Sequence, residues 1–190
     1  MGFLDAILGR QKPKQANLDA LFGLPSAAVT LETAAGLAPT DRAAVCFKPP
    51  SGQSFANLVD DITATLNVGA PAEGLEISEE RDRFGYEWVV LRQPGIEQLV
   101  TSAHLVNTSL QEQGYGPHLL CSVFGFAAAE GGTKVYLVYL YKRGTFYPFV
   151  PEGQDKRDNA FELRVRGLLE GELPIEQDLA RWFPIWGLPI

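Results

Sequence analysis

The sequence predicts an α+β fold, in which a mostly antiparallel sheet is covered by helices. Residues 75–92 have the pattern of a β-hairpin, and residues 118–150 that of a three-strand meander, because both stretches are rich in β-branched and aromatic side chains. Runs with helical spacing stand before, between and after these strands. This mixed order argues against a doubly wound parallel sheet, so we expect a two-layer α/β sandwich.

The meander has the strongest strand signal in the chain. Its first two runs, residues 118–127 and 134–142, flank Gly131 and Gly132, whose freedom at positive φ allows a tight reversal. A turn at residues 143–144 then leads into a short third run. We therefore expect three consecutive antiparallel strands here.

Alternation along the second run divides its side chains between two faces, both apolar. One face carries Val135, Leu137, Tyr139 and Tyr141, and the other carries Tyr136, Val138 and Leu140. Apolar residues on both faces are typical of an inner strand that is covered on both sides. The tyrosines belong either to the core and its rim or, alternatively, to a binding groove lined by the hydroxyl groups of Tyr136, Tyr139 and Tyr141.

The elements before the hairpin are shorter. Asn17 is the expected N-cap of a short helix over residues 18–22. Ser26 is the expected cap of a second helix over residues 27–35, although residues 29–31 also fit a strand. A single domain over residues 17–190 accommodates these elements together with the sheet.

Four further elements follow from the spacing of apolar side chains. A short strand is expected over residues 43–48, and a helix that Ser54 caps should run to Leu66. A second long helix begins near Pro94 and ends at Gly114. The last one spans about residues 159–170, capped by Asp158, and the apolar stretch that follows it should pack on the body or on a partner.

Composition excludes several classes of function. The net charge of −7 leaves no domain-wide basic field, so we expect no nucleic-acid partner. No apolar run approaches the roughly 20 residues that span a bilayer, and the start of the chain lacks the pattern of a signal peptide. Cys46 and Cys121 stand in apolar runs, where a reduced buried thiol is usual. A cytoplasmic protein is the expectation.

We expect neither a metal site nor a catalytic one. His118 and Cys121 are three residues apart on a predicted strand, so their side chains point to opposite faces. His104 lies on the polar face of its helix and is expected to be exposed. The acidic pairs 60–61 and 79–80 fit solvated surface charge better than acid–base catalysis. No cofactor motif is present. The one catalytic alternative that the sequence leaves is a cysteine–histidine pair brought together by the fold.

The first 16 residues are expected to form an amphipathic segment and a basic linker. Phe3, Leu4, Ile7 and Leu8 make one apolar stripe on a short helix, which needs something to cover it. It packs on its own domain, on a protein partner or on a membrane surface, where the cations that follow it suit anionic lipids. This stripe is the best sequence candidate for an interface.

Three stretches carry a family resemblance: MGFLDAILGR at the start, NLDALFGLPSAAVTLE after it, and RAAVCFK further on. With the aromatic hairpin and the ending WFPIWGLP, the chain resembles the PspAB family of PspA-associated proteins from actinobacteria and archaea. The resemblance implies a role beside PspA, the membrane-associated coiled-coil protein of the phage-shock, envelope-stress response, and no enzymatic activity. The order of elements in the second half is also similar to small secretion chaperones.

The leading hypothesis is therefore a non-enzymatic adaptor that binds PspA or a related partner, in the cytoplasm or peripherally at the inner face of the membrane. A small-molecule or peptide-binding domain that uses the sheet face is the second hypothesis, and an enzyme of unrecognised class is the third. Association between copies of the chain stays open.

Overall fold

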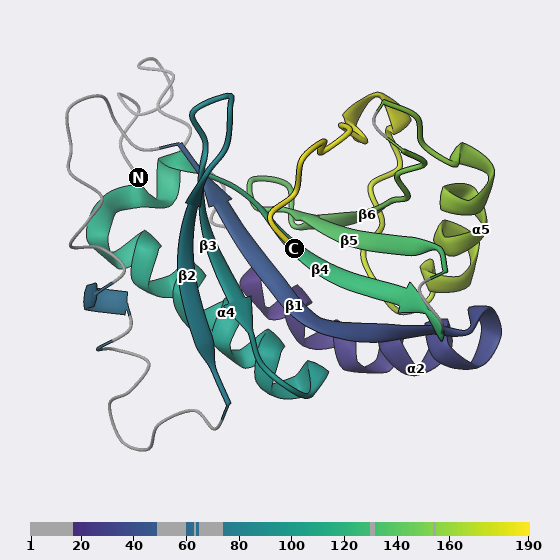
Figure 1. Ribbon diagram of the computed structural model, residues 1–190, viewed down its shortest axis with the longest axis horizontal. Helices are drawn as coiled ribbons and strands as arrows, with labels where there is room; N and C mark the ends of the chain where they lie inside the picture. The colour runs from purple at the N-terminus through teal and green to yellow at the C-terminus, as the bar shows by residue number, and fades with distance from the viewer. Residues whose placement is uncertain (1–16, 49–59, 63, 65–73, 130–131, 154) are drawn as a thin grey trace, which may run out of the picture.

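The computed structural model describes residues 17–48, 60–62, 64, 74–129, 132–153 and 155–190. Within them a six-stranded antiparallel sheet has the strand order β2-β3-β1-β4-β5-β6. Helices pack on one face of this sheet, as Figure 1 shows. The predicted α+β class is confirmed, and the sheet does not close into a barrel.

The hairpin and the meander are both present. The hairpin pairs β2 (Glu76–Arg81) with β3 (Glu87–Arg92). The run of charged side chains at residues 79–83 favours a turn in the sequence, but residues 79–81 belong to β2. The meander consists of β4 (Leu119–Ala128), β5 (Lys134–Leu140) and β6 (Thr145–Phe149). Strand β5 lies between β4 and β6, as its two apolar faces predicted.

The strand predicted over residues 43–48 is longer and more central than expected. Strand β1 (Leu37–Phe47) lies between β3 and β4 and joins the hairpin to the meander. Its register against β4 shifts between Pro39 and Ala43, and Asp41 adopts a φ of 56° there. Proline and residues with left-handed backbone are rare in β-strands. The sequence therefore does not predict a strand across this irregular stretch.

Two helices cover one face of the sheet (Figure 1). Helix α2 (Leu24–Ala35) packs on β1, and α4 (Ile96–Leu110) packs on β1 and β3. The 3₁₀ helix η1 (Leu18–Gly23) leads directly into α2, which has a proline in its first turn. The predicted cap at Ser26 is therefore wrong, since this residue lies inside the helix, and so is the alternative of a strand at residues 29–31.

The predicted ends of the other helices agree better with the structure. Gly114 has a φ of 88° and interrupts the helical turn that continues α4. Helix α5 (Asn159–Leu169) is capped by Asp158, whose side chain accepts a 2.8 Å hydrogen bond from the backbone N–H of Phe161. It packs against α2 and β6 at the far end of the sheet.

The segment after α5 pairs with the outer edge of β6. The N–H of Phe146 donates to the carbonyl of Pro174 at 2.8 Å, and the N–H of Glu176 donates to the carbonyl of Phe146 at the same distance. A short parallel bridge joins Phe146 to Ile175. The chain then passes through the 3₁₀ helix η5 (Leu179–Arg181).

Two predicted segments lie wholly or mostly outside the described residues. The stripe of Phe3, Leu4, Ile7 and Leu8 is one of them. Of the helix predicted from Ser54 to Leu66, the structure describes residues 60–62 and 64, which are helical, and Ile62 is fully buried. The packing of that helix therefore stays a prediction.

Candidate binding cleft and exposed apolar ledge

The face of the sheet opposite α2 and α4 is partly covered by the tail segment, which we define as residues 182–190 (Figure 1). The hydroxyl group of Tyr136 donates to the carbonyl of Ile190 at 3.2 Å, and that of Tyr147 donates to the carbonyl of Phe183 at 2.8 Å. Trp182 stacks on Tyr147, with ring centroids 6.0 Å apart. The tail segment was expected to pack on the body or a partner, and it packs on the body.

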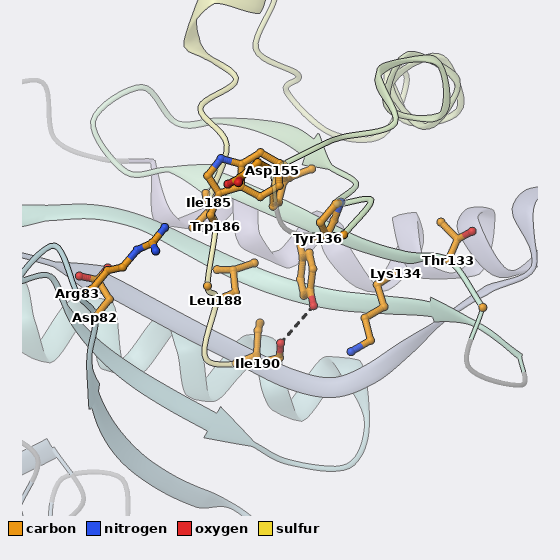
Figure 2. Close-up of a pocket in the computed structure, with 15 residues that line it drawn as sticks. Asp82, Arg83, Thr133, Lys134, Tyr136, Asp155, Ile185, Trp186, Leu188 and Ile190 are labelled. Atoms are coloured by element: carbon orange, nitrogen blue, oxygen red, sulfur yellow. Dashed lines mark hydrogen bonds between the residues drawn. The ribbon is translucent and has the colours of Figure 1, made fainter.

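A cleft of about 900 Å³ lies between the tail segment and the sheet. In Figure 2 Arg83, from the turn between β2 and β3, lies at one end, and Lys134, at the start of β5, lies towards the other. Leu188 and Tyr136 lie between them. Its lining therefore combines an apolar middle with charged ends.

Aromatic contacts hold the apolar part of the cleft in place. Phe149 stacks on Tyr136, with centroids 6.4 Å apart, and Trp186 meets Phe149 edge-on at 5.1 Å. Burial raises the pKa of Tyr136, against the opposing effect of the Arg42 charge. Its hydroxyl group therefore remains a neutral hydrogen-bond donor at physiological pH.

The charged residues of the cleft differ in how far they are engaged. Asp82 is committed to its own turn, since it accepts hydrogen bonds from the N–H groups of Phe84 and Tyr86 and, at 3.1 Å, from the indole of Trp88. Arg83 lies over the ring of Phe84 at 4.8 Å. Within the described part of the chain neither Arg83 nor Lys134 forms an ion pair.

Of the three tyrosines predicted as groove lining, only Tyr136 lines this cleft. Tyr139 and Tyr141 lie on the helix face of the sheet, as the alternation predicted. The hydroxyl group of Tyr139 donates to the carbonyl of Asn17 at 2.8 Å, and that of Tyr141 donates to Oε1 of Gln111 at 3.1 Å. The three side chains therefore do not share one groove.

A second surface is formed by α5 and η5. Leu163 and Leu179 are 48% and 51% exposed, and we call these two side chains the α5 ledge. Leu163 and Leu179 border a cleft of about 320 Å³ that Trp182 also lines.

Hydrogen bonds of Arg157 and Glu162 hold the elements that carry the ledge in place. Nε of Arg157 donates to both carboxylate oxygens of Glu162, at 2.8 and 3.0 Å, and Nη1 donates to the carbonyl of Trp182 at 2.6 Å. Glu162 also accepts a 2.9 Å hydrogen bond from the N–H of Val150. This buried network fixes α5 relative to β6 and to the tail segment.

The cysteines face each other across two strands. Cys46 on β1 is directly opposite Cys121 on β4, and both are buried. A hydrogen bond between the two thiols and their burial raise the pKa of Cys46 above its usual range. The thiol of Cys46 is therefore suited to packing and not to nucleophilic attack.

Among the described residues no hydrogen bond joins either histidine to a cysteine. His104 stacks on Phe22, with centroids 5.0 Å apart, and is half-buried instead of exposed as predicted. His118 lies in a short 3₁₀ helix before β4. No cluster of three or more metal-ligating side chains occurs among the residues that the structure describes. In the same part of the chain no helix is long and apolar enough to span a bilayer.

The model of one protein family, PspAB, described as PspA associated protein B, matches residues 1–190. The chain belongs to this family. The name of PspAB indicates association with PspA, which is consistent with an accessory role. No curated protein and no solved structure matches the chain, so the similarity to small secretion chaperones stays a hypothesis.

The sequence singled out Tyr136 as a lining residue of a groove, but it indicated neither the other residues of the cleft nor those of the ledge. In the sequence Lys134 stands out only as the first residue of the predicted strand run 134–142, and Arg83 belongs to no distinguishing pattern. The aromatic tail was the one available signal, since three apolar residues follow Trp182 within four positions. It indicated packing but not a cleft.

Proposed function

We propose that this protein is a non-enzymatic adaptor that binds PspA or a related partner during envelope stress. Membership of the PspAB family supports the choice of partner. The structural observation that carries the proposal is the α5 ledge, because exposed apolar side chains that cluster on a surface are typical of protein interfaces.

The ledge has features of a small binding centre. Leu163 and Leu179 flank a shallow cleft, and the buried Trp182 lies at its base. A helix of a coiled-coil partner presents apolar side chains at regular spacing, and such side chains fit shallow apolar clefts between helices. The network of Arg157 and Glu162 keeps the cleft preorganised, which lowers the entropic cost of binding.

A second contact belongs to the same proposal. The stripe of Phe3, Leu4, Ile7 and Leu8 has the pattern of an interface with a partner or with a membrane surface. An adaptor that holds a membrane-associated partner gains avidity from two separate contacts. We therefore test the ledge and the stripe separately and together.

The experiment is affinity measurement between the full-length chain and the PspA of the same organism, by co-purification and calorimetry. Leu163→Glu with Leu179→Glu is expected to weaken binding by about a hundredfold, since two apolar side chains that the partner would cover are lost and charges are placed in the contact. Val29→Glu is the matched control, because Val29 is an exposed apolar residue on α2 that is not part of the ledge. Leu4→Asp with Ile7→Asp tests the stripe, with PspA and with anionic vesicles as separate arms.

Three results would contradict parts of the adaptor proposal. Failure of the wild-type chain to bind PspA contradicts the adaptor proposal. Binding that the ledge variant retains in full, while its thermal unfolding is unchanged, removes the ledge from the interface. A stripe variant that loses thermal stability instead of affinity places those side chains in the core.

A second candidate function is a peptide- or small-molecule-binding domain. The cleft beside Tyr136 favours it, because its volume of about 900 Å³ falls in the usual range of ligand sites and apolar side chains line it together with a few polar ones. One molecule can have both functions, because the residues of the ledge and those of the cleft are different.

A further inference from the structure

The fold brings together two cysteines that lie far apart in the sequence. Cys46 and Cys121 are the only cysteines of the chain. They are directly opposite each other in the antiparallel pairing of β1 with β4, and both are buried, with 3% and 8% of their surface exposed. Within the molecule, each thiol therefore has the other as its only partner for a disulfide bond.

The backbone geometry of this pair suits a disulfide. Directly opposite residues of antiparallel strands have Cα atoms about 4.5 or about 5.5 Å apart, and both distances fall in the range of about 4.4–6.8 Å found in disulfides. A hydrogen bond already joins the two thiols. The register shifts directly after the pair, between Cys46 and Phe47, and this irregularity gives the backbone room to adjust. Closing an S–S bond therefore requires little movement of the strands.

The pair also lies where the two halves of the sheet meet. Strand β1 borders the hairpin of β2 and β3, and β4 is the first strand of the meander, so their pairing joins the two halves (Figure 1). In the reduced chain the backbone of the two strands is held together by the hydrogen bonds of the ladder. A covalent link at this position would close a long loop of the chain and restrict the unfolded state.

We propose that Cys46 and Cys121 form a reversible disulfide when the protein is exposed to a peroxide, and that this bond fastens the two halves of the sheet. Cys121 is the more exposed of the two and reacts first. The O–O bond of hydrogen peroxide breaks, one oxygen joins the sulfur of Cys121 as a sulfenic acid, and water leaves. The sulfur of Cys46 then bonds to that of Cys121, and the hydroxyl group leaves with the thiol proton of Cys46 as a second water. A dithiol reductant returns two electrons and two protons and restores both thiols.

Burial makes this reaction slow and confines it to the pair. The hydrogen bond with Cys121 and burial raise the pKa of Cys46, so this thiol is a poor nucleophile towards reagents from solution. The second step needs no reagent from solution, because the two sulfurs are neighbours and the departing hydroxyl group takes the proton. The pair therefore responds to sustained oxidation, and the disulfide forms within one molecule and not between two.

The experiment treats the reduced, full-length chain with hydrogen peroxide under native conditions. Digestion with trypsin, without reduction, should give a product that joins residues 43–81 to residues 93–134, the two peptides that contain the cysteines. Free thiols counted in urea should fall by two per chain and return after treatment with dithiothreitol. The thermal midpoint should rise by about 5–10 °C after oxidation and return to its first value after reduction.

Cys121→Ser with Ser122→Cys is the matched control. It keeps two cysteines in the same two peptides, but it moves the second thiol to the opposite face of β4, since neighbouring residues of a strand point to opposite faces. This variant should give no linked peptide and no rise in thermal midpoint. Cys46→Ser measures any effect of peroxide elsewhere in the chain, such as on Met1. Thermal unfolding of each reduced variant confirms that it folds.

Four outcomes are incompatible with the proposal. The first is addition of oxygen to a cysteine without the linked peptide, and the second is a disulfide that joins two chains instead. The third is an equal yield of the linked peptide in the control variant, and the fourth is a linked chain whose thermal midpoint does not rise. None of these measurements involves PspA, so the adaptor proposal and this inference stand or fall separately.

Discussion

The hydroxyl group of Tyr139 donates a 2.8 Å hydrogen bond to the backbone carbonyl of Asn17, a residue 122 positions earlier in the chain. The bond joins the inner strand β5 to the start of η1 and so ties the first described helix to the sheet. Burial, with smaller contributions from Tyr141 and Asp19, raises the pKa of Tyr139 to about 12. The hydroxyl group therefore keeps its proton over the whole physiological range.

Replacing Tyr139 with phenylalanine should lower the free energy of unfolding by about 1–2 kcal/mol, because the carbonyl of Asn17 loses its donor while the ring packing stays. Urea denaturation measures the change. Tyr115→Phe is the control: the ring of Tyr115 packs on Phe47, and its hydroxyl group makes no hydrogen bond to the described residues. A change at Tyr115 as large as that at Tyr139 would contradict the assignment.

Glu176 should make stability depend on pH. Burial alone would raise its pKa, but hydrogen bonds from Arg143, the N–H of Asp178 and the hydroxyl of Thr145 lower it below the usual range. A carboxyl group whose pKa is lower in the folded state adds stability above its unfolded pKa, and that stability is lost as pH falls through the folded value.

The corresponding variant is Glu176→Gln. The wild-type chain should lose more unfolding free energy than this variant between about pH 6 and about pH 3, as measured by urea denaturation at each pH. Glu170→Gln, at an exposed position where the carboxylate pairs with Arg166, serves as the comparison. Parallel curves for the wild-type chain and Glu176→Gln would rule out the effect.

Cys46 should react slowly with thiol reagents. Its raised pKa, due to the hydrogen bond with Cys121 and to burial, keeps the thiol protonated, and alkylation requires the thiolate. Iodoacetamide should therefore modify the native chain far more slowly than the chain in urea, with mass spectrometry as the readout. Peptide mapping separates the modification of Cys46 from that of Cys121. Equal rates in the native and the unfolded chain would disprove this account.

Asp41 should tolerate glycine or asparagine better than valine. Its φ of 56° lies in the left-handed region, which β-branched residues avoid, and its carboxylate accepts a 3.1 Å hydrogen bond from the N–H of Gly95. Asp41→Val should cost about 2–3 kcal/mol of unfolding free energy, and Asp41→Asn less than about 1 kcal/mol. Thermal and urea unfolding of the two variants, compared with Asp41→Gly, separate strain from the lost hydrogen bond.

The strands of the meander and the hairpin could be predicted because both have strong local patterns. The central strand β1 could not be predicted in full, since Pro39 and Asp41 break its pattern and only the register against β4 makes that stretch a strand. Helix α2 begins before Ser26 because η1 feeds directly into it. Pairing with β4 decided the first case, and the direct continuation of η1 into α2 decided the second.

The candidate sites were less accessible to prediction than the fold. Alternation placed Tyr136 opposite Tyr139 and Tyr141, which is correct, and this already separates the three side chains. What alternation cannot indicate is that the tail segment returns to the same face as Tyr136, so that Arg83 and Lys134 come to border one cleft. These residues are far apart in the sequence and have no shared periodicity.

The pairing of β6 with residues 174–176 also bears on how the protein behaves at high concentration. The unpaired N–H and carbonyl groups of an edge strand can form hydrogen bonds with a strand of another molecule. In β6 the backbone groups of Phe146 already form hydrogen bonds with Pro174 and Glu176 of the same chain. At the opposite margin, β2 presents mostly charged side chains, among them Glu76, Glu79 and Glu80. Loss of the segment around Pro174 should therefore promote fibrillar aggregation of an otherwise well-folded molecule.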